Sequence, residues 1–309
     1  MSVIKSFAVG LGDMFYIEHN SDNFTIIDCF LNAENTEIVL DQLGPLVRAK
    51  GISRTISTHP DDDHVRGLEK LEARVGIQNF YVVKNNVTKP DRTVSFDKYC
   101  ELRDDPKKAF YISKGCSRKW MNKGDDERGS SGIEILWPDL ENANFKEALA
   151  EAHAGESPNN MSAIVRYSLN DGASVMWLGD LHHDFMETIE GSFDTSPVDI
   201  IFAPHHGRRT GRIPYTLLQK LKPKIIIIGE AATEHLHYYQ GYNTITQNSA
   251  GDVILDCREG KVHIYTSKNY SRDFLNDEYL HLQQTGGLID ITKHPTRLYY
   301  IGSFNTRAR

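Results

Sequence analysis

The sequence predicts a mixed α/β fold, because two kinds of segment follow each other along the chain. Short apolar runs rich in β-branched residues, such as Ile133–Trp137 and Lys224–Ile228, are typical of buried strands. Longer stretches with apolar residues at helical spacing, such as Thr36–Lys50, are typical of amphipathic helices. The early strands come in hairpin-like pairs more than in strict strand-helix-strand alternation, which favours sheets of mixed direction.

The individual elements follow from the same patterns. Strands are expected at Phe7–Val9, Met14–Glu18, Thr25–Asp28, Thr55–Thr58, Asn79–Val83, Ile133–Trp137, Ser162–Ser168, Ser174–Leu178, Asp199–Ala203 and Lys224–Ile228. Helices are expected at Thr36–Lys50, Val65–Val75, His183–Glu190 and Pro214–Leu221. Two further apolar runs, at 251–255 and 261–265, flank a turn and predict a hairpin. No element is predicted after Asn269, and there is no internal repeat.

The composition narrows the class of protein. The chain has 309 residues, of which 39% are hydrophobic and 25% charged, as is ordinary for a globular protein. It contains no run of about 18 apolar residues, so no membrane span is expected. The four cysteines, Cys29, Cys100, Cys116 and Cys257, show no CxxC spacing, and the first residues resemble a strand more than a signal peptide. A reducing cytoplasmic location is therefore expected.

The net charge limits the ways in which the chain can bind a polyanion. Its 35 Lys and Arg residues stand against 42 Asp and Glu residues, which gives a net charge of −7. The surface as a whole does not attract nucleic acid. A local basic patch or bound metal ions would have to do so.

The strongest chemical signal is the segment THPDDDH at positions 58–64, which follows an expected strand and precedes an expected helix. Its side chains His59, Asp61, Asp63 and His64 are metal-ligand types, and so many in one turn repel each other unless a cation lies among them. The alternative is a plain helix start in which Asp63 caps the helix. We favour a metal site, because other strands end in the same chemistry.

Three apolar strands each run into ligand-type residues at their carboxyl ends. The first leads to the segment at 58–64, the second to Gly179-Asp180, and the third to His205-His206-Gly207. A polar loop with Asn160 and Ser162 precedes a further strand, although such residues also commonly close turns. The pattern predicts one shared rim of ligands.

Two basic features near these segments point to an anionic substrate. Arg208, Arg209 and Arg212 follow the histidine pair, and guanidinium groups bind phosphate oxygens in pairs. They are interpreted as substrate-binding residues, with a solvated turn as the alternative. The stretch 89–128 is rich in Lys, Arg and aromatic residues. It is interpreted either as an insertion that stacks bases and contacts phosphates or as a surface excursion with a few core aromatics.

These motifs resemble the metallo-β-lactamase superfamily, whose signature begins with HxHxDH. More narrowly, the chain is similar to the soluble hydrolase domain of ComEC-type DNA-uptake proteins. The shared features are VGLGD at 9–13, the strand end IID at 26–28, the Asn-x-Ser loop at 160–162, the Gly-Asp pair and HHG. They cover most of residues 3–267 in the same order. The membrane segments of the uptake channel are absent, so the resemblance implies a free-standing relative.

The resemblance implies an αββα sandwich, here one domain over 1–309 with the insertion at about 89–128. It also implies two divalent ions per chain. His59 and Asp61 would belong to the first ion, and Asp63, His64 and one histidine of HHG to the second, with Asp180 between them. His205 is favoured as that ligand and His206 as a proton-handling residue, although the two could be exchanged.

Asp61 and Asn160 stand where relatives carry histidine. Oxygen ligands favour harder cations, so Mn²⁺ or Mg²⁺ is expected beside Zn²⁺.

The leading functional hypothesis is metal-dependent hydrolysis of a phosphodiester in DNA, RNA or a nucleotide, with Asp63, His206 and Asp180 as catalytic residues. Arg208, Arg209, Arg212, Asn160 and Ser162 would bind the substrate. One alternative keeps the chemistry but acts on a lactone, thioester or β-lactam. Another is a weakly active subunit that binds a partner protein, since the resemblance includes accessory proteins of larger machines such as anti-phage defence systems.

Overall fold

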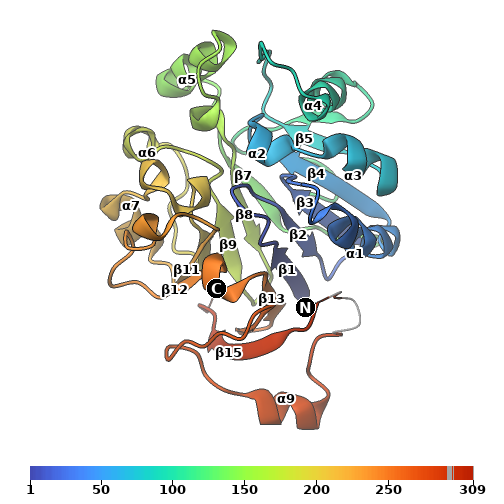
Figure 1. Cartoon of the computed structure of the whole chain (residues 1–309), viewed down its shortest axis with the longest axis vertical. Helices are drawn as coiled ribbons and strands as arrows, with labels where there is room; N and C mark the ends of the chain where they lie inside the picture. The colour runs from blue at the N-terminus through green and yellow to red at the C-terminus, as the bar shows by residue number, and fades with distance from the viewer. Residues whose placement is uncertain (291–293, 295, 309) are drawn as a thin grey trace.

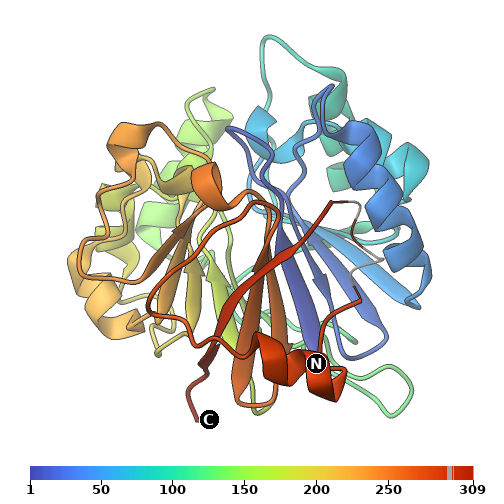
Figure 2. The same cartoon turned by 60° about the horizontal axis from the view of Figure 1, so that its bottom comes forward.

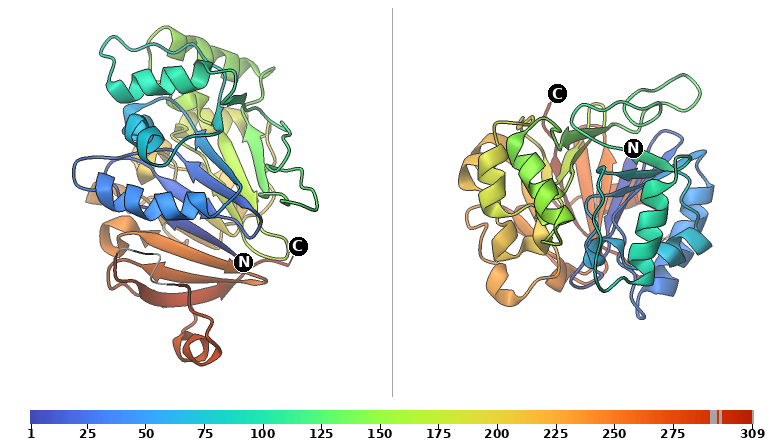
Figure 3. Two further views of the ribbon diagram at one scale, coloured as in Figure 1. Left: turned by 90° about the vertical axis from the view of Figure 1, so that its right-hand side faces the viewer. Right: turned by 90° about the horizontal axis from the view of Figure 1, so that it is seen from above.

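The structure is a computed structural model that describes residues 1–290, 294 and 296–308. Two mixed β-sheets lie face to face, and helices cover the outer side of each (Figure 1; Figure 3, right). The helices of the first part of the chain flank one sheet and those from the middle of the chain flank the other. This is the αββα sandwich that was predicted, with two mixed sheets between helical layers, and the fold class is confirmed.

The larger sheet has the strand order β15-β14-β13-β1-β2-β3-β4-β5-β6 within the described residues. Its strands are β1 (Ser2–Ser6), β2 (Phe15–Glu18), β3 (Asn23–Ile27), β4 (Ile52–Ser57), β5 (Phe80–Val82), β6 (Ala109–Tyr111), β13 (Val253–Arg258), β14 (Lys261–Thr266) and β15 (Tyr299–Asn305). Strands β1, β2 and β3 pair antiparallel, whereas β3 to β6 run parallel.

The smaller sheet has the order β12-β11-β10-β9-β8-β7. Its strands are β7 (Ile133–Trp137), β8 (Ile164–Ser168), β9 (Ser174–Trp177), β10 (Ile200–Phe202), β11 (Ile225–Ile228) and β12 (Thr244–Thr246). Strands β9 to β12 are parallel, so their carboxyl ends meet at one edge. The predicted ligand segments after β9 and β10 therefore lie next to each other.

The helices occupy the outer layers and the C-terminal end. They are α1 (Thr36–Arg48), α2 (Asp62–Val65), α3 (Leu68–Arg74), α4 (Val94–Asp104), α5 (Ala143–His153), α6 (His183–Ile189), α7 (Tyr215–Leu221), α8 (Gln247–Ala250) and α9 (Tyr279–Thr285). No helix in the described part of the chain is long and apolar enough to cross a membrane.

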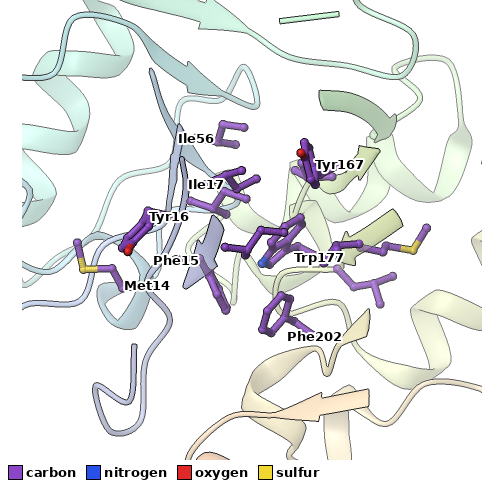
Figure 4. Close-up of a cluster of buried hydrophobic side chains, with 14 of the residues drawn as sticks. Met14, Phe15, Tyr16, Ile17, Ile56, Tyr167, Trp177 and Phe202 are labelled. Carbon is purple, nitrogen blue, oxygen red and sulfur yellow. The ribbon is translucent and has the colours of Figure 1, made fainter. Parts of the chain in front are cut away.

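Aromatic side chains from the two sheets meet in the core (Figure 4). Phe15 on β2 contacts Phe202 on β10, with ring centres 4.8 Å apart, and Trp177 on β9 stacks on Phe202 at 5.2 Å. All three rings are buried. Because Trp177 and Phe202 are the last residues of their strands, this packing fixes where the two following loops begin.

Two predicted elements differ from the structure, and elements occur in the C-terminal part, where none was predicted. The first strand is Ser2–Ser6 and not Phe7–Val9, because residues 7–14 form the connection to β2, closed by a bond from the Phe7 N–H to the Met14 carbonyl. The helix expected over Val65–Val75 is two helices, α2 and α3, because the chain leaves helical geometry at Arg66. Residues after Asn269 do form elements, α9 and β15, and β15 extends the sheet beside β14 (Figure 2).

The stretch 89–128 is built into the first layer. Helix α4 lies in the helix layer, and β6 pairs parallel with β5 at the edge of the larger sheet. Phe96 and Tyr99 are buried, with 2% and 0% of their surface exposed, so these two rings cannot stack on an external base. The aromatic residues of α4 therefore pack in the hydrophobic core.

Candidate metal centre

Asp180 is the centre of the site. Its carboxylate is buried, and four histidine rings surround it. His64 Nε2 lies 3.0 Å from one carboxylate oxygen. The Nε2 atoms of His205 and His206 each lie 3.6 Å from the other oxygen, and His59 Nε2 lies 4.0 Å from it. The strands ending near positions 58, 180 and 205 thus converge at one rim, as predicted.

The sharp turn at Gly179 directs Asp180 into this position. Gly179 has φ +52°, and a Cβ there would lie 2.6 Å from the Cβ of Ser162. The Ser162 hydroxyl accepts a hydrogen bond of 3.0 Å from the Asp180 N–H. A larger residue at position 179 would displace the carboxylate.

His64 is oriented by the carboxylate of Asp28, the residue that directly follows β3. Its Nδ1–H donates to Asp28 at 2.9 Å, and Asp28 also accepts from the Thr58 N–H and the Thr58 hydroxyl at 2.7 and 2.8 Å. Burial by itself would lower the pKa of His64, but the carboxylates of Asp180 and Asp28 outweigh it and raise this pKa well above its usual value. The Nε2 atom is thereby aimed at Asp180.

His206 is held in a similar way from a distant segment. Its Nδ1–H donates to Asp13 at 3.0 Å, and its Nε2 lies 3.2 Å from Asp63. Burial alone would lower the pKa of His206, but Asp13 and Asp180 raise it to about 10. Asp13 reaches the ring because Gly12 passes close to α2, where a Cβ would lie 2.7 Å from the Asp63 carbonyl oxygen.

The chemistry of this cluster fits a metal ion. Asp13, His64, Asp180 and His206 each offer a ligand-type atom, and these atoms lie within 4.8 Å of one another. His59 Nε2, His64 Nε2 and Asp180 Oδ1 are buried without a hydrogen-bond partner, since the last two are close but not aligned as a hydrogen bond. Each such atom costs about 1–3 kcal/mol unless it is satisfied. A cation would satisfy all three.

The cluster of four ligand-type residues includes Asp13, whereas the contacts of His206 favour Asp63 as the carboxylate nearer to the metal. Asp13 contacts Nδ1 of His206, whereas Asp63 contacts Nε2, the atom that faces Asp180. Burial alone would raise the pKa of Asp63, but its contacts with His206 and His64 lower it below the usual range. We therefore regard Asp63 as the carboxylate on the metal side of His206, and Asp13 as the group that orients the ring.

Asp61 turns away from the other ligands. Its carboxylate oxygen lies 2.9 Å from Lys89 Nζ, and the two side chains are 28% and 24% exposed. Among the described residues, neither Asp61 nor Asp63 belongs to a cluster that could hold a metal ion, but the carboxylate of Asp63 contacts one member of such a cluster, His206, at 3.2 Å. The two aspartates of the predicted signature therefore face different partners.

His205 faces both Asp180 and the outside. Thr210 Oγ1 lies 2.8 Å from its Nδ1, and the ring of His182 stacks on it at 5.5 Å. Burial lowers the pKa of His205 to about 4, although the carboxylate of Asp180 opposes this shift. Both His205 and His206 have positive φ, at 52° and 56°, so the chain turns sharply and presents the two rings differently.

The side chains of Asn160 and Ser162 support the loop that carries Asp180. The Asn160 side-chain oxygen accepts from the His182 N–H at 3.1 Å, and Ser162 is fully buried. The structure thus places these two predicted substrate-binding residues in contact with the backbone of residues 180–182. Their hydrogen bonds stabilise the backbone that carries Asp180.

A surface pocket of about 490 Å³ lies beyond His205. It is lined by His182, His183, Asp184, Arg209, Thr210 and Arg212. One guanidinium nitrogen of Arg208 lies 3.5 Å from His205 Nε2. Two of the three predicted arginines therefore line this pocket, and the third contacts a histidine of the centre.

The roles of Asp13 and Asp28 were not assigned from the sequence. Both stand in segments that carry the family resemblance, VGLGD at 9–13 and the strand end IID at 26–28, but neither residue was given a role. The available signal was a carboxylate directly after an apolar strand. It does not say which histidine, 36 or 193 residues away, the carboxylate will meet.

No protein-family model matches the sequence, and no curated protein matches it. Among solved structures, the chain is similar to Igni18, described as a novel metallo hydrolase from the hyperthermophilic archaeon Ignicoccus hospitalis KIN4/I. The identity is 16% and the TM-score 0.44, over 75% of this chain and 84% of that one. It is also similar to a mutant form of CmlA beta-hydroxylase, at 13% identity and TM-score 0.45 over 82% of this chain. The match spans 53% of that protein, about half its length.

Proposed function

We propose that the chain is a metal-dependent hydrolase of the metallo-β-lactamase superfamily that cleaves phosphodiesters in nucleic acid or nucleotides. The observation that carries the proposal is the convergence of buried histidines on Asp180, with unpartnered ligand atoms, beside a surface lined by arginines. The buried histidines and unpartnered ligand atoms support a bound metal ion. The arginine-lined surface supports a substrate that contains phosphate.

The ion would be held by Asp63, His64, Asp180 and His206. Nitrogen and carboxylate ligands suit Zn²⁺ or Mn²⁺, with Mg²⁺ as a further candidate. With an ion bound, these four residues would hold a centre able to activate water at neutral pH and to offset charge on the phosphoryl group. A second ion, as the sequence predicted, would need His59 and Asp61 in addition to Asp180.

The protein's own groups orient the ligands. Asp28 and Asp13 each accept the Nδ1–H of a histidine, which fixes the ring and leaves its Nε2 atom facing Asp180. His206, whose side chain is buried and lies within 3.6 Å of three carboxylates, is assigned as the ligand. His205, whose side chain is 12% exposed and lies between Asp180 and the pocket, is assigned to proton handling.

The arginines would bind the substrate. Arg208 stands beside His205, and Arg209 and Arg212 line the adjoining pocket. Because the chain has a net charge of −7, a polyanion needs such a local cationic surface. The reacting group of a lactone or thioester carries no negative charge that three guanidinium groups would bind. The arginines therefore favour a phosphodiester over a substrate that is cleaved at a carbonyl group.

The test is a substrate panel with the metal varied. Purified protein loaded with Mn²⁺, Zn²⁺ or Mg²⁺ is incubated with labelled DNA, RNA and cyclic dinucleotides, and in parallel with nitrocefin and acyl thioesters. We expect cleavage of at least one phosphodiester and its loss in Asp180→Asn with the fold intact by circular dichroism. Retained cleavage in Asp180→Asn would refute the mechanism.

The same panel separates the other candidates. Turnover of a carbonyl compound alone would support the lactone, thioester or β-lactam alternative. Metal binding without any turnover would support a subunit that acts through a partner protein, including a ComEC-like accessory role in a defence system. Absence of metal binding would refute the proposed metal-dependent function.

A further inference from the structure

Lys89 forms an ion pair with the aspartate that was expected to bind a metal. Its ammonium nitrogen lies 2.9 Å from Asp61 Oδ1, and the two side chains are 24% and 28% exposed. The ring of Phe96 on α4 lies 5.3 Å from the same nitrogen. The lysine comes from the connection between β5 and α4, so the pair joins the larger sheet's outer layer to the rim of the site.

The pairing leaves a second ion with few ligands. Asp63, the other carboxylate of the signature, is directed to His206, so it serves the centre at His64 and Asp180. The oxygen of Asn160 already accepts the His182 N–H. Of the side chains predicted for the first ion, His59 Nε2 and the shared Asp180 Oδ1 have no hydrogen-bond partner, and His59 Nε2 lies 4.0 Å from the other oxygen of Asp180.

An ammonium group and a divalent cation exclude each other at one carboxylate oxygen. The two cations repel each other, so the ammonium group at Asp61 lowers the affinity of this carboxylate for a divalent ion. One nitrogen and one shared carboxylate make a poor site compared with the four ligands of the other ion. The difference in ligand number, and not only the ion pair, sets the order of affinity.

We propose that this chain holds one divalent ion tightly, at Asp63, His64, Asp180 and His206, and that the ammonium of Lys89 takes the place of a second ion at Asp61. The inference rests on the proposed function only in requiring a metal at Asp180. It assigns to Lys89 the role of setting the metal stoichiometry, and it holds for any substrate.

The test counts metal ions. Wild-type protein is saturated with Mn²⁺ or Zn²⁺, freed of unbound metal by gel filtration, and analysed by mass spectrometry for metal per chain. We expect one ion per wild-type chain and two per chain in Lys89→Met, which keeps the length of the side chain and removes its charge. Lys89→Met combined with Asp61→Asn should return to one.

The electron paramagnetic resonance spectrum of the Mn²⁺-loaded protein gives a readout independent of yield and activity. Isolated ions are expected in the wild type and an exchange-coupled pair in Lys89→Met. By calorimetry, the second ion should bind Lys89→Met up to about fivefold more tightly than the wild type, since a partly exposed ion pair contributes up to about 1 kcal/mol. Lys84→Met is the matched control, because Lys84 lies over Tyr111 and not at Asp61.

The outcomes distinguish this inference from the proposed function. Two ions of similar affinity in the wild type would overturn the role of Lys89 and leave the proposed function standing. One ion in both wild type and Lys89→Met would overturn it as well. No bound ion in the wild type would overturn the proposed function and this inference together.

Discussion

Replacing Asp28 by asparagine should weaken metal binding although Asp28 is not a ligand. The carboxylate accepts three hydrogen bonds, two from Thr58 and one from His64. Asparagine offers one acceptor oxygen, so its NH₂ group faces at least one of these donors. One buried donor without a partner costs about 1–3 kcal/mol of unfolding free energy. Losing the partner of a metal-binding histidine typically lowers metal affinity about 10–100-fold, which is about 1.4–2.7 kcal/mol.

The assay for Asp28→Asn has two readouts, the free energy of unfolding in denaturant and the affinity for Zn²⁺ in competition with a chromophoric chelator. Asp256→Asn is the control, because Asp256 is a buried carboxylate on β13 that pairs with Arg258 away from the site. It should lose stability and keep its Zn²⁺ affinity. If Asp28→Asn behaves like this control, the orienting role of Asp28 is wrong.

Two further substitutions test the support of the site and the substrate surface. Gly179→Ala should lose at least about 1 kcal/mol of unfolding free energy, because φ is positive and the new Cβ meets Ser162; an unchanged melting temperature would contradict the geometry of this turn. Arg209→Ala and Arg212→Ala should each raise KM for a phosphodiester about tenfold with little change in kcat, since a charged hydrogen bond contributes about 1.5 kcal/mol or more. Arg74→Ala on α3 is the control, and an equal effect there would show that the pocket is not specific.

Much of the fold could be predicted because burial leaves a local pattern. Ile133–Trp137 was predicted with its observed bounds, and most other strands within one to three residues, since runs of buried apolar residues are visible in sequence. The helix at 65–75 was predicted as continuous because the apolar spacing continues through Arg66. The break depends on contacts of that segment with the rest of the chain, such as the Leu31 N–H donating to the Arg66 carbonyl.

The convergence on Asp180 could also be predicted, because carboxyl ends of parallel strands meet at one edge. The partner of each side chain could not. His205 and His206 are neighbours with the same chemistry, and only the two positive φ angles decide which ring lies between Asp63 and Asp180. The pairing of Asp61 with Lys89 likewise joins residues from separate connections.

The order of apolar runs and polar strand ends thus determined by itself the mixed α/β class and the rim at which metal-ligand residues gather, whereas the αββα layers were implied by the family resemblance. Such patterns are local, since each strand buries its own side chains and ends at its own polar residues. Only the tertiary structure decided that Asp13 and Asp28 orient two histidines and that Asp61 faces an ammonium group. Those choices depend on directions and distances between segments far apart in the chain, which spacing along the chain does not encode.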